Sequence, residues 1–319
     1  MKKVKVQDAI GMTLCHDITA MVDGFKGAAF KRGHVVTQED IPRLLDIGKQ
    51  HVFIWEENAG EIHEEDAARR LSQMTTVDGA HSGSTSEGKI QLFADQDGML
   101  RVDKALLAAV NRIGDITITT LPDHYPVKAG DRLASMRIVP LVTEERQIAE
   151  AEALCADKQL YDLRPFKPLK VGIIITGSEI YHGRIKDKFE RVARAKLAHY
   201  PAEILGVHVC DDELDMIVGA GRTLLAEGAE LLIFSGGMSV DPDDLTPSAI
   251  REMGAEIVSY GVPSQPGNMT LVAYLDQAAL LGVPGAAISR PTTMFYVLLP
   301  QIFCGDPLTK DDLIRLGEG

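Results

Sequence analysis

The chain has 319 residues, of which 45% are hydrophobic and 25% are charged, and its formal net charge is −13. This length exceeds what one hydrophobic core usually supports, so we expect a folded, soluble protein of two or three domains. The negative charge argues against sequence-independent binding of nucleic acid, which requires clustered Lys and Arg side chains.

The apolar segments are all shorter than the roughly 20 residues that cross a membrane, and the first residues contain no apolar core of a signal peptide. We therefore expect a cytoplasmic protein with no membrane partner. Cys15, Cys155, Cys210 and Cys304 are far apart in sequence and form no CxxC pair, which indicates reduced thiols that pack in a core.

Residues 1–75 have the pattern of a small α+β unit. Short β-like runs occupy residues 4–6 and 51–55. Between them, residues 38–47 are predicted to form a helix with Thr37 as its N-cap, because a Thr side chain can accept a hydrogen bond from the first turn.

Residues 76–165 are predicted to be β-rich. The segment begins with a Gly- and Ser-rich stretch at 76–89, which is typical of a loop or linker. The elements expected after it are a helix at 103–112, a strand at 116–120, a turn at 129–131 between two strands, and a connecting helix at 143–158. Pro165 and Pro168 then mark a domain boundary.

From residue 169 to residue 319, apolar strand-like runs alternate with amphipathic helices. This alternation predicts βαβ crossovers and therefore an α/β domain with a doubly wound, mostly parallel sheet. In such folds ligands bind beyond the carboxyl ends of the strands, so the loops that directly follow strands are the candidate functional sites.

The first candidate loop is residues 176–179, directly after a predicted buried strand, and it continues through residues 181–184 into a helix. Thr176, Gly177 and Ser178 would let a ligand approach the backbone, and Glu179 could accept hydrogen bonds from a ring or act as a general base. The alternative is an ordinary capped turn. His182 is the only histidine in a candidate loop, and the nine histidines show no metal-ligand spacing.

Two acidic segments follow the next predicted strands. Asp211 and Asp212 could position a metal or a polar ligand, or one of them could cap the helix that begins near Glu213. Residues 236–244 continue from Gly236 and Gly237 into an acidic loop, and a helix is expected to start at about residue 245. This second segment predicts a backbone cradle with carboxylates at its rim.

Two Pro/Gly loops occur further along, at residues 262–268 and 282–285, with a predicted strand pair between them. Such loops can position backbone groups around a ligand, but they are equally typical of hairpin and crossover turns. The candidate residues here are Pro266, Gly267, Pro284 and Gly285.

In order along residues 169–304, the segments ITGSEI, VCDDELD, IFSGGMSVDPDDLTPSAI, YGVPSQPGN and LGVPGAAIS resemble the molybdenum-cofactor biosynthesis domain. This domain is shared by molybdopterin adenylyltransferases and molybdopterin molybdotransferases. The resemblance implies a site for molybdopterin or the molybdenum cofactor. The residues implied to contact this ligand are Thr176, Gly177, Ser178, Gly236, Gly237, Ser239, Pro266, Gly267, Pro284 and Gly285.

Three carboxylates are the catalytic candidates, namely Glu179, Asp211 and Asp244, and Asp244 is also the candidate ligand for Mg²⁺. The chain departs from the family at Asn268, where molybdotransferases carry Lys, and at Met238 and Ser239, where adenylyltransferases carry Thr and Gly. Three functions therefore stay open: a cofactor-assembly or delivery protein, a noncatalytic cofactor sensor, and a metal-dependent nucleotide pyrophosphatase of the competence-damage type. The resemblance also implies a homodimer or homotrimer and a molybdoenzyme or biosynthetic protein as partner.

Overall fold

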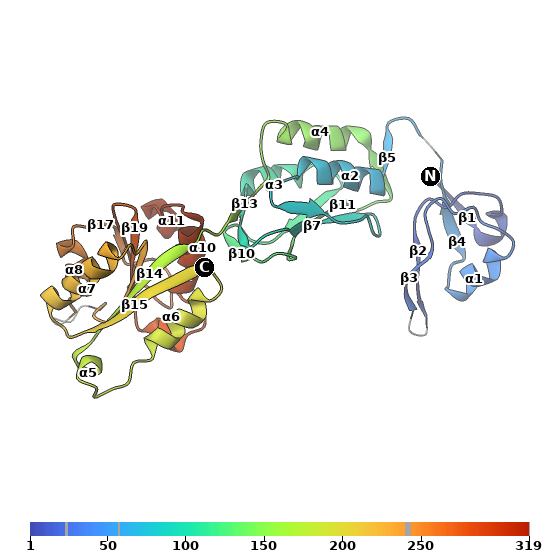
Figure 1. Cartoon of the computed structure of the whole chain (residues 1–319). Helices are drawn as coiled ribbons and strands as arrows, with labels where there is room; N and C mark the ends of the chain where they lie inside the picture. The colour runs from blue at the N-terminus through green and yellow to red at the C-terminus, as the bar shows by residue number, and fades with distance from the viewer. Residues whose placement is uncertain (23–24, 57, 240–243, 319) are drawn as a thin grey trace. The chain divides into compact units, whose positions relative to one another are not determined.

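The computed structural model describes residues 1–22, 25–56, 58–239 and 244–318. The chain folds into two compact units, Met1–Leu163 and Arg164–Gly319, and Figure 1 shows the elements of both. Within these described residues, no helix combines the length and the apolar character needed to cross a membrane. All four cysteines are free and buried, as the sequence predicted.

The first unit begins with a small core that runs from Val4 to Ile54. Its elements are β1 (Lys2–Lys5), β2 (Ile18–Val22), β3 (Phe25–Phe30), α1 (Asp40–Asp46) and β4 (His51–Ile54). The prediction of Thr37 as a helix N-cap was wrong. The Thr37 hydroxyl donates to the Asp40 side chain at 2.8 Å, and Glu39 occupies the N-cap position without a side-chain cap.

The second core of this unit runs from Ile62 to Leu163. An antiparallel sheet of order β6-β7-β11-β9 and a second sheet of order β10-β8-β13 pack with three helices, which confirms a β-rich region. The elements are β5 (Glu61–His63), α2 (Glu64–Met74), β6 (Ala80–Ser82), β7 (Lys89–Ala94), β8 (Gly98–Val102), α3 (Lys104–Val110), β9 (Ile116–Thr120), β10 (Tyr125–Val127), β11 (Arg132–Ile138), β12 (Val142–Glu144), α4 (Glu145–Cys155) and β13 (Tyr161–Pro165).

The Gly- and Ser-rich stretch at 76–89 is not wholly a loop or linker. Its residues Ala80–Ser82 form β6, which pairs with β7 in antiparallel register. Gly79 and Gly88 have φ angles of 79° and 69°, so these glycines supply tight turns inside the sheet rather than a flexible connection. The division into three domains, with boundaries near residues 75 and 165, stays a prediction.

The second unit contains a six-stranded sheet of order β15-β14-β16-β19-β18-β17. Strands β15, β14, β16 and β19 are mutually parallel neighbours, and β18 runs antiparallel to both β19 and β17. This confirms the predicted α/β, mostly parallel sheet. Its elements are β14 (Leu169–Thr176), α5 (Ser178–Tyr181), α6 (Phe189–Leu197), β15 (Ala202–Cys210), α7 (Leu214–Ala226), β16 (Leu231–Ser235), α8 (Thr246–Glu252), β17 (Glu256–Tyr260), β18 (Leu271–Leu275), β19 (Ala278–Val283), α9 (Ala286–Ser289), α10 (Met294–Cys304) and α11 (Lys310–Arg315).

Alternating side chains of the central strands pack on the two faces of this sheet, which is why the strands read as continuous apolar runs. In β16, Leu231 and Ile233 face a core shared with α6, α10 and α11, whereas Leu232 and Phe234 face a core shared with α7 and α8. Figure 1 shows these two groups of helices on either side of the strands. Both faces of the sheet are therefore covered by helices, so its strand ends are the candidate places for a ligand.

The five residues before β14 belong to this second unit. The Arg164 guanidinium pairs with the Asp306 carboxylate, and the Lys167 N–H donates to the Phe303 carbonyl at 2.7 Å. The Phe166 ring lies edge-on to the Tyr200 ring, with centroids 4.9 Å apart. These contacts anchor the entry of the chain onto α10 and the loop after α6.

We expect a fragment of residues 164–319 to be more stable than a fragment of residues 169–319, because the shorter one loses the ion pair, the backbone hydrogen bond and the ring contact. Together these should contribute about 1–3 kcal/mol to the free energy of unfolding. Urea unfolding followed by far-UV circular dichroism measures the difference. A fragment of residues 159–319 serves as control and should match 164–319. Equal midpoints for 164–319 and 169–319 would show that the five residues are dispensable.

Candidate functional site

The candidate loops follow β14, β15, β16, β17 and β19, and all five lie at one edge of the sheet. Four of these strands are parallel. The fifth, β17, is antiparallel to β18, which is antiparallel to β19, so β17 ends at the same edge. The topology thus places at one edge every loop that the sequence singled out.

A cluster of buried hydroxyl groups joins the loops after β14 and β16. Thr246, at the start of α8, is fully buried, and its hydroxyl donates to the Gly236 carbonyl at 2.8 Å. The Thr176 hydroxyl lies 3.3 Å from the Thr246 hydroxyl and 3.5 Å from the Ser235 carbonyl. The side chain of Thr176 is therefore turned into the protein, where it ties the two loops together.

Positions 236 and 237 need glycine because a side chain at either position would press against neighbouring parts of the chain. Their φ angles are 96° and 53°, in the region that side chains disfavour. A Cβ atom on Gly236 would overlap the Thr176 carbonyl, and one on Gly237 would lie 3.1 Å from the Thr246 hydroxyl. The next two residues are described, Met238 buried and Ser239 exposed, but residues 240–243 of the predicted acidic loop lie outside the described residues.

The two adjacent aspartates have different roles. The Asp212 carboxylate accepts a 2.8 Å hydrogen bond from the Ser178 N–H, so it holds the loop after β14 rather than capping α7. The α7 N-cap position is occupied by Glu213, which makes no side-chain cap. The Asp211 carboxylate accepts from the Asp212 N–H at 2.9 Å and lies 3.0 Å from His182 Nε2.

These contacts lower the pKa of Asp211 below its usual range, first through the hydrogen bond from the Asp212 N–H and further through Ser178 and His182. The loops after β14 and β15 are thus linked by two carboxylates. Glu179 is exposed at the same loop, close to the backbone of Gly177. Ser178 and Glu179 are the residues of this loop that are accessible to a ligand.

Tyr260, at the end of β17, supports the loop after β16. Its hydroxyl lies 3.1 Å from the Met238 carbonyl and 2.9 Å from the Ser239 carbonyl, so it can donate to either. Burial raises the pKa of Tyr260, and the nearby Asp244 carboxylate raises it further, so the hydroxyl keeps its proton. Sequence reasoning missed this residue because a Tyr at a strand end has no distinctive pattern.

The two Pro/Gly loops form a second group of contacts. Gly267 has a φ of 107°, and a Cβ there would lie 3.5 Å from the Met294 N atom and 3.6 Å from Thr293, at the start of α10. Pro266, before it, is exposed. Pro284 and Gly285 lead from β19 into α9, where Gly285 is the N-cap residue. The loop after β17 therefore lies, at Gly267, against the start of α10.

Among the residues that the structure describes, no three His, Cys, Asp or Glu side chains are arranged to hold a metal ion. Asp241 and Asp243 lie outside the described residues. The described carboxylates near the site are Glu179, Asp211, Asp212 and Asp244, and they make this edge acidic.

We expect Gly237→Val to destabilise the second unit, because the branched side chain would adopt a disfavoured φ and press against Thr246. The expected loss in the free energy of unfolding is about 2–4 kcal/mol. Denaturant unfolding of the full chain measures it. Gly219→Val, in α7 where a Cβ meets nothing within 4 Å, is the matched control and should cost little. A Gly237→Val protein as stable as the control would mean that the loop has room for a side chain.

We expect His182→Ala to raise the pKa of Asp211 without restoring its ordinary value, since the hydrogen bond from the Asp212 N–H remains. In the native protein the lowered pKa means that ionised Asp211 stabilises the fold above its unfolded pKa, and that this contribution is lost as pH falls through the folded pKa. Carbon-13 NMR titration of the carboxyl group measures the shift, with His199→Ala as control. An unchanged pKa in His182→Ala would argue that the histidine contact is absent in solution.

Family models match two parts of the chain. Residues 172–303 match the family model described as "Probable molybdopterin binding domain". Residues 3–56 match a model described as "Domain of unknown function (DUF8806)".

Individual relatives match parts of the chain. A molybdopterin molybdenumtransferase of Synechococcus elongatus is 23% identical over 174 residues, which are 51% of this chain and 43% of that protein. A CinA-like protein of Mycobacterium sp. (strain JLS) is 33% identical over 90 residues, 28% of this chain and 21% of that protein. The chain thus spans less than half the length of these two relatives.

A solved structure of the molybdopterin biosynthesis moea protein from Pyrococcus horikosii aligns with 99% of this chain and 76% of its own, at 15% identity and a TM-score of 0.35. The match to the family model covers the five loops at the edge of the parallel sheet. Residues 172–303 of this chain form a domain of the molybdopterin-binding family.

Proposed function

We propose that the second unit binds molybdopterin, or the molybdenum cofactor made from it, at the edge formed by the loops after β14, β15, β16, β17 and β19. The protein would then act in the assembly of the cofactor, in its delivery to an enzyme, or in the regulation of either step. The observation that carries this proposal is the direct contact between the loops 176–179, 210–212 and 236–246, which come from three different strands.

The accessible groups at this edge suit a pterin phosphate. The exposed hydroxyl of Ser239 and the partly exposed Ser178 can donate to phosphate or ring oxygens, and Glu179 can accept from pterin N–H groups. Thr176, Gly236 and Gly237 would act indirectly, because they fix the backbone that presents these groups. Asp211 and Asp244 would be the carboxylates that take part in a reaction, if the protein catalyses one.

Magnesium and partners belong to the same proposal. Asp244 is the carboxylate that would hold Mg²⁺ beside a phosphate, since carboxylate oxygen is the ligand type that Mg²⁺ prefers. We propose a cytoplasmic homodimer or homotrimer that hands the cofactor to, or receives it from, a molybdoenzyme or a biosynthetic protein. Size-exclusion chromatography with light scattering gives the stoichiometry directly.

Titration of the full chain with purified molybdopterin tests the central proposal. We expect saturable binding at micromolar concentrations, and weaker binding by a Ser178→Ala, Glu179→Gln double variant. Asp215→Asn, on the exposed side of α7, is the control and should bind like the native protein. Absence of saturable binding at these concentrations would refute the proposed function.

Asp244→Asn separates catalysis from binding. The amide keeps the size and an oxygen acceptor, but it removes the negative charge that Mg²⁺ requires. If the protein is an enzyme, the variant should bind molybdopterin within about tenfold of the native affinity and lose about 10² or more in turnover. The assays are Mg²⁺-dependent adenylyl transfer to molybdopterin and molybdate insertion into the adenylylated form. A native protein that binds but is inactive in both assays supports the sensor role instead.

A second candidate is a metal-dependent nucleotide pyrophosphatase, whose signature the string from Gly236 to Thr246 also resembles. The observation that favours it is the acidic character of the edge, where Glu179, Asp211, Asp212 and Asp244 lie on neighbouring loops. Release of phosphate from ADP-ribose in the presence of Mg²⁺, and its loss in Asp244→Asn, would establish this activity. No release by the native protein would eliminate it.

A further inference from the structure

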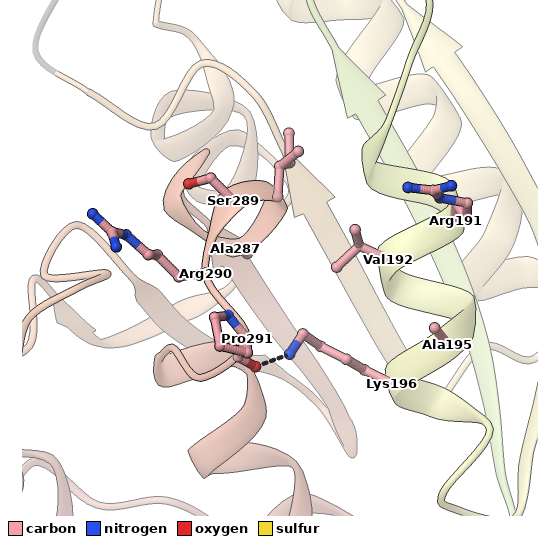
Figure 2. A pocket seen from close by; sticks show the side chains of 9 residues that line it. Arg191, Val192, Ala195, Lys196, Ala287, Ser289, Arg290 and Pro291 are labelled. Atoms are coloured by element: carbon pink, nitrogen blue, oxygen red, sulfur yellow. Dashed lines mark hydrogen bonds between the residues drawn. The ribbon is translucent and has the colours of Figure 1, made fainter.

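A pocket of about 420 Å³ lies between α6 and the segment that begins with α9. Figure 2 shows Arg191, Val192, Ala195 and Lys196 on the α6 side of this pocket. The opposite wall is formed by residues 287–291. The pocket shares no residue with the five candidate loops, although its second wall starts two residues after Gly285.

The pocket combines an apolar lining with basic groups. Val192, Ala195, Ala287 and Pro291 contribute carbon surface, and Ile288, with 40% of its surface exposed, adds more. Arg191 and Lys196 contribute cations from α6, whereas Figure 2 shows the side chains of Ser289 and Arg290 directed away from α6. Mostly apolar pockets of a few hundred Å³ with a few polar groups are typical small-molecule sites.

Lys196 is held in place at this pocket without a carboxylate. Its Nζ donates to the Pro291 carbonyl at 2.7 Å and lies 5.1 Å from the centre of the Tyr296 ring. Figure 2 shows the side chain crossing from α6 to Pro291. Since an ammonium group has three N–H donors, two are left for a ligand. Burial lowers the pKa of Lys196 because it disfavours the charged ammonium group, and a bound anion would offset this penalty.

The arginines at the pocket are also uncompensated. Neither Arg191 nor Arg290 forms an ion pair with any residue that the structure describes, whereas Arg194, on the same helix, pairs with Glu190 at 2.8 Å. Residues 184–196 contain six basic and two acidic residues in a chain whose net charge is −13. Such a local reversal of charge attracts anions from solution.

From these observations we propose that the pocket between α6 and α9 binds a small organic phosphate. The phosphate would contact Arg191 and Lys196, and the apolar body would rest on Val192, Ala287 and Ile288. Arg is suited to this because its planar guanidinium binds two phosphate oxygens at once. This proposal does not depend on molybdopterin binding at the strand ends.

The test uses the full chain and three probes: 1-naphthyl phosphate, 1-naphthol and inorganic phosphate. We expect calorimetry to show saturable binding of 1-naphthyl phosphate, and at least tenfold weaker binding of 1-naphthol and of inorganic phosphate. The Arg191→Gln, Lys196→Gln double variant should lose at least tenfold in affinity for 1-naphthyl phosphate. Arg194→Gln, a change of the same charge on the same helix but outside the pocket, should stay within twofold.

Several results would overturn the proposal. One is the absence of saturable 1-naphthyl phosphate binding, and another is an affinity of the double variant within twofold of that of the native protein. A third is an equal loss of affinity in Arg194→Gln, which would indicate only a diffuse charge effect. Equal affinity for 1-naphthol would show that the cations play no part. If molybdopterin displaced 1-naphthyl phosphate, the probe would bind at the strand ends and not in this pocket. Molybdopterin binding by the double variant should stay unchanged, so failure here is distinguishable from failure of the proposed function.

Discussion

The candidate site depends on one hydrogen bond, from the hydroxyl of the fully buried Thr246 to the Gly236 carbonyl. This bond fixes the start of α8 to the end of β16. Because Gly236 has no side chain, its backbone can lie against the Thr176 carbonyl of β14. A fully buried hydroxyl or carbonyl without a partner costs about 1–3 kcal/mol, so this contact strongly favours one loop conformation. This hydrogen bond therefore fixes the backbone that leads to the exposed Ser239, whereas the partly exposed Ser178 is held by the Asp212 carboxylate.

The fold of the second unit could be predicted because its central strands β14, β16 and β19 are largely buried on both faces. Alternate residues of β16 enter two different cores, so neither face can be polar, and the sequence shows this as the unbroken run LLIF. The first unit was harder to predict. Its strands are short, and glycines at positions 79 and 88 serve turns inside a sheet, which in sequence resemble a linker.

The positions of the candidate loops could be predicted from the sequence, but the contacts of their residues could not. Strand ends can be located from the apolar pattern, so the loops after β14, β15 and β16 were found. The role of Asp212 could not be found, because the group that it holds, the Ser178 N–H, lies 34 positions away in sequence. The same applies to Tyr260, which supports Met238 and Ser239 from another strand. Contacts between distant residues depend on register, and register is fixed only when the whole sheet forms.

The distribution of charge distinguishes two ways in which this unit could hold an anion. The strand-end site presents Glu179, Asp211 and Asp244, so a phosphate there must rely on backbone N–H groups, on hydroxyls, or on a divalent cation between the carboxylates and the ligand. The pocket beside α6 presents Arg191 and Lys196 and needs no cation, because its own side chains carry the compensating charge. Chelation of divalent ions should therefore affect the two sites differently, since a cation bridging two negative groups is essential only where the protein itself is acidic.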